Sequence, residues 1–219
     1  MEPYFKLGPY TRPITTKSSE AETWFNRGLN WCYAFHHKEA IRCFEKAIKL
    51  DPKCVMGYWG VAYATGPYYN IPWEKMSPSG RPEAIKTCFE YAQKAKKLME
   101  TVPLSEIERA LCDALVVRFQ ANEALEIEEL KKWDDDYADA MRIVYRNFSD
   151  DYDVCALTAE ALVVRTPWQL WDLKNRTPAE GTFTEEAIEI VEKALGRIEK
   201  NNHTPHAGLL HFYMHIMEM

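Results

Sequence analysis

Large and small apolar residues recur with helical spacing in two consecutive segments, and this pattern constrains the fold more than any other feature of the chain. Its members are Trp24, Gly28 and Trp31 in the first segment and Ala40, Phe44 and Ala47 in the second. Steps of four and three residues place each set on one helix face. The small residues let two helices approach closely, and the aromatic rings fill the space between them. Pro52 ends the second segment because proline lacks the backbone donor that a helix needs, so the pattern predicts two antiparallel helices joined by a short turn.

This spacing over residues 21–52 resembles the tetratricopeptide repeat, a helix–turn–helix unit of about 34 residues. Tyr58 stands 34 positions after Trp24, so a second unit begins on schedule. Phe89 follows Phe44 by 45 positions, so the second helix of that unit comes late. The opening of the chain, its GPYYNIPW loop and its histidine-rich end also resemble a group of uncharacterised bacterial and fungal repeat proteins. The resemblance implies a superhelix of antiparallel helix pairs that binds a protein or peptide partner.

The rest of the chain keeps the helical rhythm, and no segment alternates with the period of a strand. Ser19 and Ser105 each precede a glutamate by three residues, which is the spacing of a capping box at the start of a helix. Two insertions, residues 66–82 and 166–181, break the rhythm with prolines and glycines. We therefore predict an all-α protein, a tetratricopeptide-like α–α superhelix with two loop insertions.

The domain organisation follows from where the helical pattern begins. We expect residues 1–18 to be an extended N-terminal segment and residues 19–219 to form the helical repeat domain. The last helix carries the apolar residues Leu209, Phe212 and Ile216, yet no partner helix follows it. Because a stack of repeats needs a polar capping helix at its end, we expect the chain to be cut short at its C-terminus.

Composition excludes several classes of partner. The chain has 219 residues with 27 basic and 33 acidic side chains, a net charge of −6. Binding to nucleic acid needs a basic surplus, and no apolar run approaches the roughly 20 residues that cross a bilayer. We therefore expect neither nucleic acid nor a membrane as a partner. None of the six cysteines forms a C-x-x-C pair, which indicates buried free thiols. Together these features predict a cytoplasmic protein and leave its oligomeric state open.

The candidate metal site lies on the last helix. His211, His215 and Glu218 are separated by steps of four and three residues, so they share one helix face. Two imidazoles one turn apart can hold a divalent transition metal, with the carboxylate as third ligand and water as fourth. The HExxH arrangement of metalloproteases is absent, and a polar stripe without a metal is the simpler alternative. A metal-binding protein or metal-dependent enzyme is thus the second hypothesis beside a binding scaffold.

Aromatic and histidine residues near three turns form the candidate ligand site. Each turn falls between the first and second helix of a pair, so we expect all three at the same edge of the superhelix. Aromatic side chains that converge from loops can line a pocket for a ligand or peptide. Alternatively, the loops fold back and bury their rings in small satellite cores. The candidate residues are His36, His37, Tyr68, Tyr69, Asn70, Trp73, Trp168 and Trp171.

Overall fold

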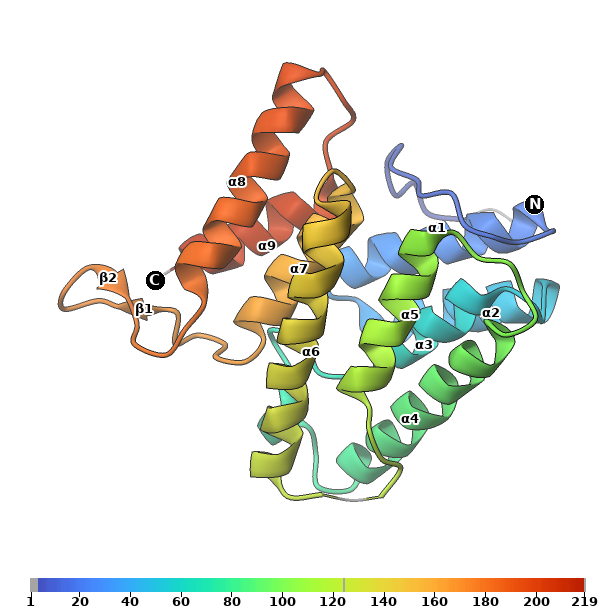
Figure 1. Ribbon diagram of the computed structural model, residues 1–219, viewed down its shortest axis with the longest axis horizontal. Helices are drawn as coiled ribbons and strands as arrows, with labels where there is room; N and C mark the ends of the chain where they lie inside the picture. Colours follow the sequence, from blue (N-terminus) through green and yellow to red (C-terminus); the bar gives the residue numbers. More distant parts are fainter. Residues whose placement is uncertain (1–3, 124, 219) are drawn as a thin grey trace.

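The computed structural model describes residues 4–123 and 125–218, and helices make up most of this part of the chain (Figure 1). Consecutive helices pack against each other from α1 to α9, which confirms the all-α, tetratricopeptide-like architecture. The helices are α1 (Ser19–Tyr33), α2 (His37–Leu50), α3 (Val55–Thr65), α4 (Gly80–Leu98), α5 (Glu106–Arg118), α6 (Ile127–Phe148), α7 (Tyr152–Val163), α8 (Thr184–Lys200) and α9 (Ala207–Met217).

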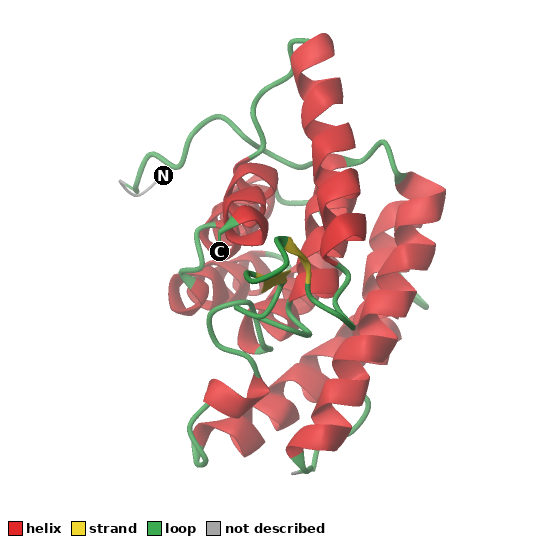
Figure 2. Ribbon diagram, turned by 90° about the vertical axis from the view of Figure 1, so that its left-hand side faces the viewer, coloured by secondary structure: helices red, strands yellow, loops and turns green. Residues whose placement is uncertain are grey.

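The two insertions hold the remaining regular structure. A single 3-10 turn, η1 (Trp73–Lys75), lies in the first insertion. The second contains a short antiparallel hairpin, β1 (Trp171–Asp172) and β2 (Thr177–Pro178), which the sequence pattern did not predict. Two-residue strands are too short to show an alternating pattern. Figure 2 shows this hairpin as the strand-bearing element among the described residues.

The first repeat is built around Phe44 of α2. A methyl group added to Gly28 of α1 would lie 2.6 Å from the Phe44 ring, and one added to Gly60 of α3 would lie 2.5 Å from it. These distances are too short for any side chain, so both flanking helices need glycine where they cross Phe44. The structure thus explains why a small residue occurs at Gly28 in the sequence pattern.

The capping boxes are only partly as expected. The box at Ser105 is confirmed, with both of its reciprocal hydrogen bonds present. At α1, however, Ser18 rather than Ser19 caps the helix. The carboxylate of Glu22, which the pattern assigned to the cap, instead accepts a hydrogen bond from the backbone N–H of Ile14 at 3.2 Å. The carboxylate of Glu22 therefore binds the segment before α1 instead of capping the helix.

Residues 4–18, hereafter the N-terminal strap, form no helix and lie over α1 (Figure 1). All six cysteines are free and buried, as expected. Within the described ranges, no helix is both long and apolar enough to cross a membrane. Met219, where we expect the chain to be cut short, lies outside the described residues.

Candidate functional site

The three turns meet at one edge of the molecule, as the sequence predicts. Phe35, in the α1–α2 turn, packs on Tyr68 of the first insertion with ring centroids 5.3 Å apart. Tyr69 packs edge-on against Trp168 of the second insertion at 5.9 Å, and its hydroxyl accepts a hydrogen bond from the Trp168 backbone N–H at 3.2 Å. Trp171 donates from its indole nitrogen to the backbone carbonyl of the α9 residue Ile216 at 2.7 Å. We call Phe35, Tyr68, Tyr69, Trp168 and Trp171 the aromatic edge.

Two aromatic residues at this edge have unusual backbone conformations. Phe35 has φ of 55° and Trp168 has φ of 59°. Bulky residues seldom adopt this left-handed region, because the Cβ atom approaches the backbone carbonyl. Such conformations persist only where the surrounding structure holds them, and they are found often at functional sites. Packing between the turns therefore holds both rings in place.

A pocket of about 290 Å³ opens at the aromatic edge. The Trp168 side chain beside it is half exposed, so its ring remains available for contact with a ligand. Four of the predicted site residues line this pocket, from both the ligand set and the metal set. The lining residues are Tyr69, Trp168, Leu170, Trp171, Leu173 and Glu218.

His37 is packed into the structure rather than open to a ligand. Its ring stacks on Tyr68 at 3.8 Å with an interplanar angle of 15°, and its Nδ1 lies 2.9 Å from the carbonyl oxygen of Ala64. Burial lowers the pKa of His37 to about 4, so the ring is neutral at pH 7. Its part in the site is to support Tyr68.

Three other candidates lie away from the pocket. Trp73 is fully buried and packs on Phe119 with ring centroids 6.4 Å apart, so here the loop folds back and its ring joins the main hydrophobic core rather than a separate satellite core. His36 caps α2 and lies against Trp31 at 5.1 Å. Asn70 is exposed in the turn of the first insertion. The convergence of loops was predictable, but which way each side chain points depends on the core beneath it.

The histidines of α9 form a close pair. The Nε2 atoms of His211 and His215 lie 3.1 Å apart. Nδ1 of His211 lies 2.5 Å from the carbonyl oxygen of Tyr33, and Nδ1 of His215 lies 2.8 Å from Oε1 of Glu218. Burial lowers the pKa of His211, which favours its neutral form.

Glu218 is not placed as the third metal ligand that the sequence predicts. It contacts Nδ1 of His215, and the two nitrogens of an imidazole direct their lone pairs or protons away from each other. A carboxylate on Nδ1 therefore cannot share an ion with Nε2 of the same ring. Within residues 4–123 and 125–218, no three His, Cys, Asp or Glu side chains are grouped to hold a metal ion.

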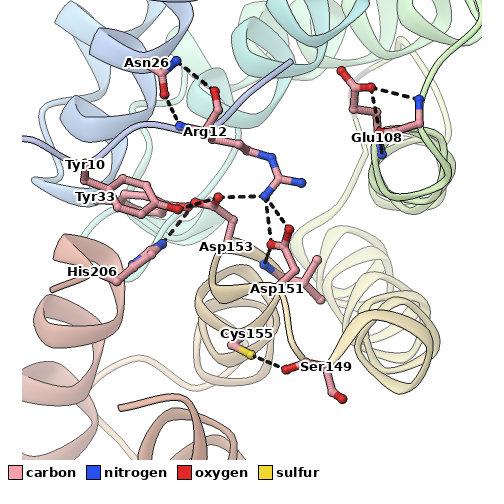
Figure 3. Close-up of polar contacts among 12 residues, drawn as sticks. Tyr10, Arg12, Asn26, Tyr33, Glu108, Ser149, Asp151, Asp153, Cys155 and His206 are labelled. Carbon is pink, nitrogen blue, oxygen red and sulfur yellow. Dashed lines mark hydrogen bonds and ion pairs between the residues drawn. The ribbon is translucent and has the colours of Figure 1, made fainter. Parts of the chain in front are cut away.

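A second site, which sequence analysis missed, holds the N-terminal strap (Figure 3). The backbone N–H of Arg12 donates to Oδ1 of Asn26 at 2.5 Å, and Nδ2 of Asn26 donates to the Arg12 carbonyl at 2.9 Å. One turn further along α1, Nδ2 of Asn30 donates to the carbonyl of Tyr10 at 3.3 Å. Two asparagine side chains of the first repeat thus hold the backbone of an extended segment.

The Arg12 side chain ends at a buried carboxylate at the start of α7. Its Nη1 lies 2.8 Å from Oδ2 of Asp153, and Nε2 of His206 lies 3.1 Å from the other oxygen. The hydroxyls of Tyr10 and Tyr33 also donate to Asp153. Burial alone would raise the pKa of Asp153, but the hydrogen bond with His206 and the charge of Arg12 lower it below its usual range. The one sequence signal was an aspartate in the first turn of a largely apolar helix.

A third buried cluster lies around Arg118 at the end of α5. Its Nη2 donates to the carbonyl of Pro67 at 2.9 Å, and its Nε lies 3.6 Å from Oδ1 of Asp134. The carboxylate of Glu160, on α7, is also buried. Burial raises the pKa values of Asp134 and Glu160 to about 7, although the charge of Arg118 lowers both. Neither oxygen of Glu160 has a partner within ordinary hydrogen-bond distance in the part of the chain that the structure describes, although a weak hydrogen bond from Tyr63 also lowers its pKa.

The comparisons with known proteins agree with the architecture of the first helix pair. Residues 21–54 match the model of the tetratricopeptide repeat family, and this range covers α2 and nearly all of α1. Searches of the curated proteins and of the solved structures found no match. The helix pair α1–α2 is therefore a tetratricopeptide repeat, and the later helices continue its packing of consecutive helices against each other.

Proposed function

We propose that this chain is a helical-repeat scaffold that binds an extended segment of a protein partner on the face of α1 that the N-terminal strap now covers. One observation supports this proposal most directly. The strap is itself an extended segment, and Asn26 pairs with both backbone groups of Arg12. The same side chain can hold the backbone of another peptide in the same way.

The chemistry of this face suggests what the partner segment carries. An asparagine side chain offers one acceptor and two donors, so it can pair with a peptide backbone whatever the sequence. Selectivity then comes from the end of this face, where Asp151 and Asp153 both accept from the guanidinium of Arg12 at 2.8 Å. Carboxylates prefer the planar fork of arginine over other cations. We therefore assign to the partner an extended segment that contains arginine.

The aromatic edge gives the same partner a second contact in this proposal. Nine large apolar side chains are exposed among the described residues, and six of them lie in the two insertions or on α9. Exposed apolar side chains that gather in one region are typical of interaction surfaces. The buried free thiols are those of a protein in a reducing compartment, and we place this binding in the cytoplasm. The six exposed residues are Ile71, Trp168, Leu173, Leu210, Met214 and Met217.

A displayed peptide library, selected against the full chain, tests the proposal. We expect selected peptides to contain arginine and to compete with the strap for Asn26. The variant Arg12→Ala loosens the strap and should bind these peptides more tightly, whereas Asn26→Ala removes the clamp and should bind them more weakly. Asn147→Ala, exposed on α6 away from both contacts, is the matched control and should change nothing. Circular dichroism checks that each variant is folded; equal affinities for all variants would place peptide binding elsewhere.

A further inference from the structure

We propose that His211 and His215 bind one divalent transition-metal ion through their Nε2 atoms, with Cu²⁺ the tightest-binding member of the class. The proposal is independent of peptide binding on α1. It also differs from the three-ligand arrangement that the sequence suggests, because it assigns Glu218 to the support of a ligand.

The hydrogen bonds of the two rings determine where their protons lie. A backbone carbonyl can only accept, so Nδ1 of His211 carries the proton that it shares with Tyr33. A carboxylate is likewise an acceptor, so Nδ1 of His215 carries the proton that it shares with Glu218. When both rings are neutral, each has its lone pair on Nε2. Two lone pairs that face each other at 3.1 Å repel each other unless a proton or a metal ion lies between them.

The separation of the two nitrogens fits a shared metal ion. Metal–imidazole bonds are about 2.0–2.1 Å long. Two such bonds place their nitrogens about 2.9 Å apart at a right angle and about 3.3 Å apart at the tetrahedral angle. The observed 3.1 Å between His211 and His215 lies between these values. A spacing of four residues on one helix is what brings the two rings to this distance.

The surroundings of the pair resemble the outer shell of a metal site. Metal-binding histidines almost always donate their second nitrogen to a carboxylate or a backbone carbonyl, which fixes the tautomer and the ring orientation. Here the two rings have one partner of each kind. Phe35 adds a third constraint, since its ring lies 4.4 Å from that of His211 and stacks on that of His215 at 5.0 Å. The backbone of Phe35 lies in the left-handed region, and its ring contacts both histidines of α9.

The two histidines would leave coordination positions open. No third described side chain is grouped with them as a ligand, so water or an anionic ligand completes the coordination. Imidazole nitrogen suits Cu²⁺, Ni²⁺ and Zn²⁺, and Cu²⁺ binds most tightly in this series.

Titration of the full, untagged chain with Cu²⁺ tests the site. Isothermal calorimetry measures the affinity and the number of ions bound, and electron paramagnetic resonance identifies the ligand atoms. We expect one tightly bound ion per chain, with hyperfine coupling to two imidazole nitrogens. His215→Ala and His211→Ala should each weaken this binding at least tenfold and remove one of the two couplings. His36→Ala is the matched control, because this exposed histidine lies outside the pair, and it should leave both readouts unchanged.

The variant Glu218→Gln distinguishes the supporting role from that of a direct ligand. Loss of an outer-shell partner typically weakens metal binding about 10- to 100-fold, so we expect weaker affinity while both nitrogen couplings remain. Circular dichroism verifies that each variant is folded. Glu218 is half exposed, so we expect Glu218→Gln to fold even if a histidine variant does not, and it then provides the test on its own. Binding that survives both histidine substitutions would identify an adventitious ion only. Absence of a tight site would show that the pair shares a proton instead, and either result would overturn the proposal.

Discussion

Helix α7 buries two carboxylates two turns apart, and their surroundings differ sharply. Asp153 is bonded to side chains from three other parts of the chain, namely the strap, α1 and the N-cap of α9. Glu160 has no described partner within ordinary hydrogen-bond distance, and only the charge of Arg118 and a weak hydrogen bond from Tyr63 lower its pKa. The pKa of Asp153 is accordingly lowered, and that of Glu160 is raised to about 7.

The difference shows what a buried charge needs in order to stabilise a fold. Removing a carboxylate from water is costly, and only hydrogen bonds with good geometry and close counter-charges offset the cost. At Asp153 those partners come from segments far apart in the sequence, so the aspartate joins the strap to the helical core. At Glu160 the cost is reduced instead by protonation, because a neutral carboxyl is easier to bury. The Asp153 cluster therefore stabilises the fold by linking distant segments, whereas the Glu160 cluster leaves a titratable carboxyl group in the core.

The largest expected effect is that of Asp153→Asn. The amide keeps only one acceptor oxygen, so the donors on its other side, either Arg12 and Tyr10 or His206 and Tyr33, face an NH2 group instead of a carboxylate oxygen. Breaking a buried ion pair from one side costs about 3–5 kcal/mol, and we expect the free energy of unfolding in urea to fall by about that amount. Asp150→Asn is the matched control, because the Asp150 side chain is 95% exposed. A change below about 1 kcal/mol at Asp153 would mean that this cluster does not fasten the fold.

The next effect is a dependence of stability on pH that comes from Glu160. Its pKa is raised in the folded chain from 4.5 to about 7, so the folded state binds more protons than the unfolded state between these values. Its contribution to the free energy of unfolding should therefore decrease as pH rises through that window, by about 2 kcal/mol between pH 5 and pH 7. Asp153 adds no slope there, because its lowered pKa confines its effect to more acidic pH.

Glu160→Gln isolates this dependence. His37, with a pKa of about 4 when folded, makes stability rise with pH up to its unfolded value of 6.5, but it does so in both proteins. The difference in unfolding free energy between wild type and Glu160→Gln should therefore report Glu160 together with its effect on Asp134, whose pKa the charge of Glu160 helps to raise. Urea titrations at pH 5, 6, 7 and 8 measure it, and parallel pH curves would show that Glu160 has an ordinary pKa.

The smallest expected effect is that of Glu160→Gln on stability at pH 7. The amide is nearly isosteric and carries no charge, and the carboxyl that it replaces is already half protonated at this pH. We expect a change within about 1 kcal/mol in either direction, measured by the same urea titration. If Glu160→Gln lowered the free energy of unfolding as much as Asp153→Asn does, the two carboxylates would contribute equally to stability, contrary to this comparison.

Much of the candidate site could be predicted in outline but not in detail. Periodicity located the turns, and the helix-pair arrangement correctly placed them at one edge. It did not show that Trp73 would be buried against Phe119 while Trp168 stays half exposed. Likewise, helical spacing placed His211 and His215 together. It did not reveal that Glu218 would contact Nδ1 of His215, the nitrogen that points away from His211. Spacing determines which helix face a residue shares, whereas ring orientation depends on contacts with other elements.

The sequence by itself determined the local structure of this protein, because the spacing of Trp24, Gly28 and Phe44 is a property of neighbouring turns on two adjacent helices. The tertiary structure alone decided which polar groups meet. Arg12 and Asp153 are separated by 141 positions, and no periodicity relates residues that far apart. Their pairing follows from burial, because a carboxylate removed from water needs partners wherever the fold can supply them. Helical repeats can therefore be read from the sequence, whereas the contacts that hold the N-terminal strap appear only in the folded chain.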